Sequence, residues 1–137
     1  MTTNPPTRRP ARSAAALLAG FVLIVALSTV TDLALHGTGV FPPEGQAMAN
    51  GLWALATVYR VAFGIAGCWL AARLAPERPM WHAMALGWVG VALSTFGTVA
   101  TWNMGPEFGP KWYPIGLVLT ALPSAWVGGK LHRPRSA

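Results

Sequence analysis

The stretch AAALLAGFVLIVALSTV, which occupies residues 14–30, runs without a single charged side chain. Apolar residues continue as far as Leu35, so the segment reaches the roughly 20 residues that an α-helix needs to cross a bilayer. Its basic start and the Ala-Leu-Ser sequence at residues 26–28 also fit a secretory signal with a cleavage site. The continued apolar character favours a membrane-spanning helix over residues 13–35, with the cleaved signal as the alternative.

Three further apolar segments follow, at residues 51–73, 81–102 and 112–129. The connections between them are rich in glycine and proline, which is typical of loops and turns. The sequence therefore predicts an all-α integral membrane protein: an antiparallel four-transmembrane-helix bundle that forms one domain over residues 13–129. The flanking residues, 1–12 and 130–137, are predicted to be basic cytoplasmic tails, the first of them disordered.

Hydrophobic residues make up 53% of the chain and charged residues 10%, whereas a soluble domain carries about 25% charged residues. A surface so poor in charge suits lipid rather than water, so the lipid bilayer is the first predicted partner. The net charge of +6 could indicate nucleic-acid binding. The basic residues, however, lie at the ends of the apolar segments and form no patch with aromatic residues, which argues against a nucleic-acid partner.

Lysine and arginine are in excess on the cytoplasmic side of membrane proteins, so their positions predict an orientation. One side of the predicted membrane carries Arg8, Arg9, Arg12, Arg73, Arg78, Lys130, Arg133 and Arg135, and the other carries Lys111. We therefore expect both termini in the cytoplasm, in a multi-pass protein of a bacterial plasma membrane. Tryptophans near the helix ends, among them Trp53, Trp102 and Trp112, are predicted to lie at the bilayer interfaces.

Small side chains recur on one face of two predicted helices. They are Gly87, Gly90, Ser94 and Gly97 on the third segment, and Gly64 and Gly67 on the second. Residues spaced three and four apart form one stripe on an α-helix, and small residues let membrane helices approach closely. Because the second and third segments are joined by a short turn, we predict that these two stripes face each other.

Two ionisable residues, Asp32 and Arg60, lie within the predicted spans. A charge at that depth costs about 2.5–3.5 kcal/mol on insertion scales, so it usually has a partner or a function. An arginine side chain extends along the membrane normal toward the interface, which brings Arg60 within reach of Asp32, with Tyr59 adjacent. We expect an ion pair that fixes the bundle, and a binding site for a small polar or ionic ligand is the alternative.

His36 follows Asp32 by four residues and therefore lies on the same helical face. Together with Glu107, from a loop predicted on the same side, these residues form a candidate polar cluster, and an Asp-x-x-x-His pair with Glu107 is one arrangement that could bind a metal ion. The spacing alone is a weak metal signal, so we predict neither a metal nor another cofactor, and we assign no catalytic residue.

The chain has no phosphate-binding loop, no G-x-S-x-G elbow and no H-E-x-x-H motif. These absences favour a non-enzymatic accessory or self-associating membrane component, whose partner is a further copy of the chain or another membrane subunit. An alternative is an oligomeric transporter or channel subunit for a small solute or ion, with Asp32 and Arg60 lining the pathway. A membrane-embedded enzyme with an outward-facing site is a third interpretation.

Overall fold

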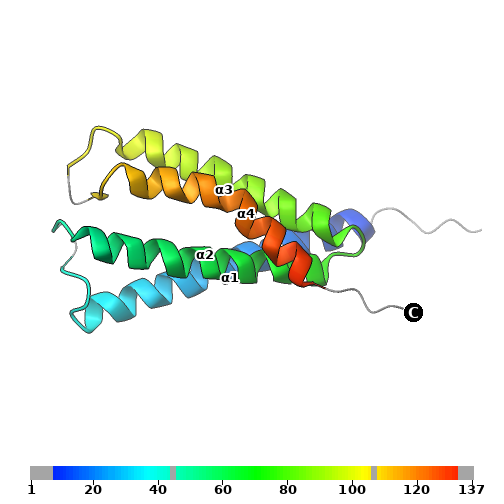
Figure 1. Ribbon diagram of the computed structural model, residues 1–137. Coiled ribbons are helices and arrows are strands. Elements are labelled where there is room, and N and C mark those ends of the chain that lie inside the picture. The colour runs from blue at the N-terminus through cyan, green and yellow to red at the C-terminus, as the bar shows by residue number, and fades with distance from the viewer. Residues whose placement is uncertain (1–7, 44–45, 106–107, 133–137) are drawn as a thin grey trace, which may run out of the picture.

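The computed structural model describes residues 8–43, 46–105 and 108–132, and it is all-helical. The four helices are α1 (Arg8–Gly37), α2 (Asn50–Leu74), α3 (Pro79–Thr101) and α4 (Trp112–Leu131). They form an antiparallel bundle in which α1 lies beside α2 and α3 lies beside α4 (Figure 1). We call the end with the connections 38–49 and 102–111 the loop end, and the opposite end, with residues 75–78, the turn end.

Three helical segments, Pro10–Gly37, Asn50–Leu74 and Pro79–Thr101, are long and apolar enough to cross a membrane. The fourth helix, α4, is 20 residues long and is not among these three segments. Large hydrophobic side chains stay exposed on the bundle surface, among them Phe96 and Val99 of α3. An exposed apolar surface of this extent suits a lipid solvent, so the chain is a helical membrane protein.

Helix α1 begins at Arg8, whereas residues 8–12 were predicted to belong to a disordered tail. Arginine is a good helix former, and Pro10 lies in the first turn, where its missing N–H is not needed for a helical hydrogen bond. The helix therefore extends into the basic segment. The remaining parts of the predicted tails, residues 1–7 and 133–137, lie outside the residues that the structure describes.

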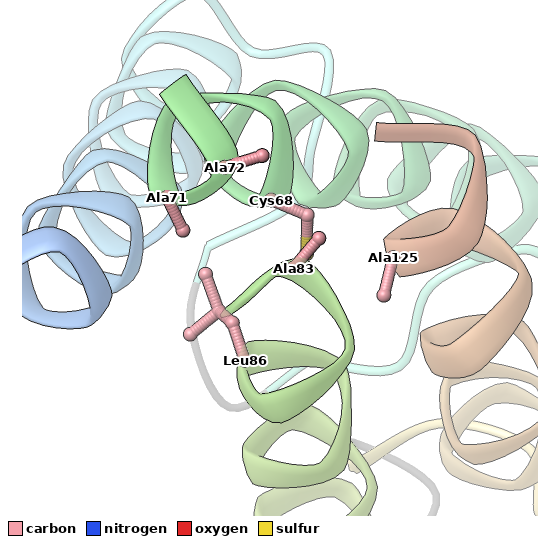
Figure 2. Close-up of a cluster of buried hydrophobic side chains, with 6 residues drawn as sticks. All are labelled: Cys68, Ala71, Ala72, Ala83, Leu86 and Ala125. Atoms are coloured by element: carbon pink, nitrogen blue, oxygen red, sulfur yellow. The ribbon is translucent and has the colours of Figure 1, made fainter. Parts of the chain in front are cut away.

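The tightest packing of the bundle lies toward the turn end, where α2, α3 and α4 meet. Its buried side chains are Cys68, Ala71, Ala72, Ala83, Leu86 and Ala125, and Figure 2 shows how they converge from the three helices. Most of them are alanines, so the helices approach closely without large side chains between them. Toward the loop end the α1–α2 pair and the α3–α4 pair diverge (Figure 1).

The small-residue stripe of α3 does not face α2, so the predicted seam between these helices is wrong. A Cβ atom added to Gly87 would lie 2.5 Å from the Cβ of Ala125 on α4, and one added to Gly90 would lie 3.5 Å from Ala121 on the same helix. A Cβ on Gly97 would meet no atom within 4 Å. Gly87 and Gly90 of this stripe lie against α4, and α3 packs more extensively against α4 than against α2.

The stripe of α2 is likewise divided between other helices. A Cβ on Gly67 would lie 2.7 Å from the carbonyl oxygen of Gly20 on α1, and one on Gly64 would lie 3.7 Å from Ser124 on α4. Helix α2 packs extensively against both α1 and α4. Its two glycines therefore allow close approach of two different helices, Gly67 that of α1 and Gly64 that of α4. Small residues permit a close approach, but they do not specify which helix makes it.

A buried histidine joins α1 to α3 at the turn end. His82 is 3% exposed; its Nδ1 lies 3.0 Å from the carbonyl oxygen of Arg78, and its Nε2 lies 2.9 Å from the hydroxyl of Ser13. A carbonyl oxygen only accepts, so Nδ1 donates to Arg78 and, in the neutral ring, Nε2 accepts from Ser13. This link fixes the start of α1 against the start of α3.

Candidate functional site

Asp32 of α1 and the neighbouring Tyr59 and Arg60 of α2 form one hydrogen-bonded group, which we call the polar cluster. Arg60 Nη2 donates to Asp32 Oδ2 at 2.5 Å, and the Tyr59 hydroxyl donates to Asp32 Oδ1. Arg60 Nη1 donates to the Tyr59 oxygen at 3.0 Å, which closes the ring. The structure thus brings together the two ionisable residues of the predicted spans and the tyrosine beside them.

The two charged side chains of the polar cluster are only partly shielded. The side chains of Arg60 and Asp32 are 26% and 30% exposed, respectively. Charge-assisted hydrogen bonds are about twice as strong as neutral ones, and a paired charge is far less costly to place in an apolar environment than an isolated one. The cluster therefore fixes α1 against α2 and carries no net charge.

Of the other two predicted members of the site, the structure describes only His36. His36 turns toward the loop that follows α1. Its Nδ1 lies 2.9 Å from the carbonyl oxygen of Pro42. The centroids of the His36 and Phe41 rings are 5.3 Å apart, and the two rings are nearly perpendicular. Glu107 lies outside the residues that the structure describes. Within residues 8–43, 46–105 and 108–132, no three histidine, cysteine, aspartate or glutamate side chains lie close enough together to hold a metal ion.

Two aromatic residues near the polar cluster were not predicted as part of a site. The rings of Trp53 on α2 and Tyr113 on α4 pack with centroids 4.6 Å apart. Gly109 permits this, because a Cβ there would lie 2.7 Å from the indole ring and its φ of +91° suits glycine. The sequence signal for Trp53 was that of an interface anchor, which gave no indication of a site.

A pocket of about 200 Å³ opens beside the polar cluster at the loop end. We call it the loop pocket. Its walls combine the cluster with the aromatic residues, and include Asp32, His36, Phe41, Trp53, Arg60 and Tyr113. Pro42, Pro43 and Gln46 from the loop after α1 also contribute. The pocket is therefore partly polar and partly aromatic, which is the usual composition of a small-molecule site.

A second cavity of about 330 Å³ lies between all four helices. We call it the central cavity. Most of its surface is apolar, and hydroxyl groups come from Ser28, Thr29, Ser94, Thr120 and Ser124. Asp32 and Arg60 line this cavity as well as the loop pocket, so the ion pair stands between the two. At the other end the cavity reaches Cys68 and Leu86, which belong to the packed core at the turn end.

No family model matches the chain, and neither a curated protein nor a solved structure matches it. The fold and the site define a helical membrane protein with a neutral polar cluster between two cavities. Any function must therefore be argued from these side chains and cavities, since a shared architecture alone implies no activity.

Proposed function

We propose that the chain is a non-enzymatic component of a bacterial plasma membrane, accessory to another membrane subunit or associating with further copies of itself. The observation that carries this proposal is the polar cluster, in which Asp32, Tyr59 and Arg60 are bonded to one another. The Asp32 carboxylate already accepts hydrogen bonds from a tyrosine and an arginine, so both of its oxygens are engaged in holding neighbouring side chains. This supports a stabilising or ligand-holding role rather than an acid, base or nucleophilic one.

Four spans with both termini in the cytoplasm are part of the proposal. Helix α4, of 20 residues, is about 30 Å long, the thickness of the hydrocarbon core. At the turn end, Arg73 lies 5.5 Å from the Trp69 ring and Lys130 lies 5.4 Å from the Trp126 ring, which suits a membrane interface.

This orientation predicts where reporters fused to the chain are active. An alkaline phosphatase fusion after Ala137 should be inactive and a fluorescent-protein fusion there bright, because both tails face the cytoplasm. The same phosphatase placed in the 38–49 loop should be active. Phosphatase activity after Ala137 would contradict the proposed orientation, and activity at neither place would contradict the fourth span or the loop assignment.

Self-association is supported by the free small-residue face in the loop half of α3. A Cβ on Gly97 would meet no atom of the described residues within 4 Å, and Gly97 lines a groove of about 310 Å³ together with Leu93 and Leu117. Phe96 and Val99 beside it are 74% and 73% exposed. Helices that pack through glycine bring their backbones close, so a second copy could insert its α3 here.

Two differently tagged copies should co-purify when expressed in one membrane, and Gly97→Leu should weaken their association about tenfold, or 1.4 kcal/mol. The leucine fills the space that the second helix needs. Gly116→Leu is the matched control, because a Cβ on that helical glycine also meets nothing within 4 Å. If the two tagged copies never co-purify, the self-association proposal is refuted. If Gly97→Leu and Gly116→Leu change the association equally, α3 is not the contact surface.

The second candidate function is an oligomeric transporter or channel subunit, favoured by the two cavities that meet at the Asp32–Arg60 pair. In this proposal the pair closes a route from the loop pocket into the central cavity. The route would end at Cys68, which is 3% exposed, so transport through one chain would also require the core at the turn end to open.

Cys68, the single cysteine of the chain, reports on this route. A small membrane-impermeant methanethiosulfonate added on the loop side should modify it slowly in the native protein. In the Asp32→Asn/Arg60→Met variant, removing the pair should raise the rate severalfold if the route exists. Thr38→Cys with Cys68→Ala gives the rate for an exposed thiol. Equal modification rates of Cys68 in the native protein and in the Asp32→Asn/Arg60→Met variant would count against the transporter proposal.

A further inference from the structure

We propose that the loop pocket binds a small zwitterion, a molecule that carries a carboxylate and an ammonium group a few ångströms apart, of the α-amino acid class. The proposal rests on the proposed function only in treating the polar cluster as non-catalytic. Three features of the pocket support it. They are the hydrogen-bonding groups that the polar cluster leaves unused, the balance of charges, and the aromatic walls together with the size of the pocket.

Arg60 has hydrogen-bonding capacity to spare. A guanidinium carries five N–H donors, and the bonds within the polar cluster take one from Nη1 and one from Nη2. Each of these nitrogens retains a second N–H, and Arg60 also lines the loop pocket. Because Nη1 and Nη2 both donate into the polar cluster, their remaining N–H groups lie on the outer edges of the guanidinium plane, where each can form a single charge-assisted hydrogen bond to a carboxylate oxygen. A ligand carboxylate could therefore add to Arg60 while the pair with Asp32 stays intact.

Trp53 carries a second unpaired donor beside the same pocket. Its indole Nε1 is buried and has no hydrogen-bond partner among the residues that the structure describes, and the side chain lines the loop pocket. Buried polar groups without partners are rare and need an explanation. An indole nitrogen only donates, so the missing partner is an acceptor, such as an oxygen of a bound ligand.

The charge of the pocket selects against a simple anion or cation. Among the described residues that line the pocket, the charges of Asp32 and Arg60 cancel each other. A lone carboxylate would therefore leave one uncompensated negative charge in a partly apolar environment, where an unpaired charge is costly. A lone ammonium ion would leave the opposite charge. A zwitterion adds both signs and keeps the pocket neutral, and Asp32, with two of its about four lone-pair sites occupied, can still accept from the ammonium group.

The aromatic walls and the volume fit the remainder of such a ligand. Phe41, Trp53 and Tyr113 line the pocket, and aromatic faces attract an ammonium group as well as an apolar side chain. The pocket has a volume of about 200 Å³. This is room for a small amino acid.

Calorimetric titration of the purified full-length protein in detergent tests this inference. The probes are glycine, alanine, leucine and glycine betaine, with acetate and methylammonium as single-charge controls. At least one zwitterion should bind, and both controls should bind about tenfold more weakly or not at all, because each leaves a charge unpaired. Binding of acetate or methylammonium as tightly as the best zwitterion, or binding of none of the probes, overturns the proposal.

Trp53→Phe removes the indole N–H and keeps an aromatic wall, so it should weaken zwitterion binding about fivefold to tenfold. Trp88→Phe is the matched control, because Trp88 is exposed on α3 and does not line the pocket. Equal affinities of the two variants would place the ligand elsewhere and refute the site. The comparison among probes uses the native protein, so it stands even if Trp53→Phe fails to fold, and it is independent of the co-purification test for self-association.

Discussion

Replacing Asp32 with asparagine should lower the free energy of unfolding by about 3 kcal/mol, because it leaves the Arg60 guanidinium partly buried without its counter-charge. Arg60→Met should cost less. In that variant the Asp32 carboxylate keeps the hydrogen bond from Tyr59, whereas in Asp32→Asn the guanidinium is left with neutral acceptors only, the Tyr59 oxygen and the amide oxygen at position 32. The side chains of Arg60 and Asp32 are 26% and 30% exposed, respectively. The expected loss of stability is therefore at the lower end of the range for a fully buried ion pair.

The double variant, Asp32→Asn with Arg60→Met, should recover most of the stability that Asp32→Asn loses, since no charge then remains unpaired. Unfolding in a mild detergent, followed by circular dichroism against a denaturant, gives the three values and hence the interaction energy between the two positions. A double variant as unstable as the sum of the single variants would show that the two side chains act independently, and the structural role of the polar cluster would be lost.

The polar cluster could be predicted because charges are rare in the apolar segments. Asp32 and Arg60 stand out in the sequence, and both the cost of an unpaired charge and the reach of an arginine side chain bring them together. The helices themselves followed from segment length and the glycine-rich connections. The predicted and observed helix boundaries differ most at the start of α1, where the helix begins at Arg8 in a basic segment. A helix can extend past the hydrophobic segment that identifies it.

The partners of the small-residue faces could not be predicted, because periodicity gives the face of a helix and not the helix opposite it. Gly87 faces α4 and Gly67 faces α1, although both were assigned to a seam between α2 and α3. The loop pocket was missed for a similar reason. Trp53 and Tyr113 are far apart in the sequence, and their contact depends on how α4 is placed beside α2.

Gly128→Ala should destabilise the bundle by about 2–3 kcal/mol, the cost of forcing extra volume into a well-packed core. A Cβ at this position of α4 would lie 2.6 Å from the carbonyl oxygen of Ile65 and 2.9 Å from the Cβ of Cys68 on α2. The nearest obstacle is backbone, which cannot rotate away as a flexible side chain can. The α2–α4 contact would have to widen along the core at the turn end.

Gly97→Ala is the matched change on α3, where the added methyl group meets no atom within 4 Å. Alanine is favoured over glycine in a helix interior by about 0.5–1 kcal/mol, so this variant should be slightly more stable than the native protein when measured as a monomer. Thermal unfolding of the two variants in the same detergent compares them directly. Because both changes add one methyl group to a helical glycine, opposite signs can come only from the neighbouring helix. If Gly128→Ala were neutral, α4 would not approach α2 as closely as the structure places it, and the closure of the central cavity at Cys68 would have to be revised.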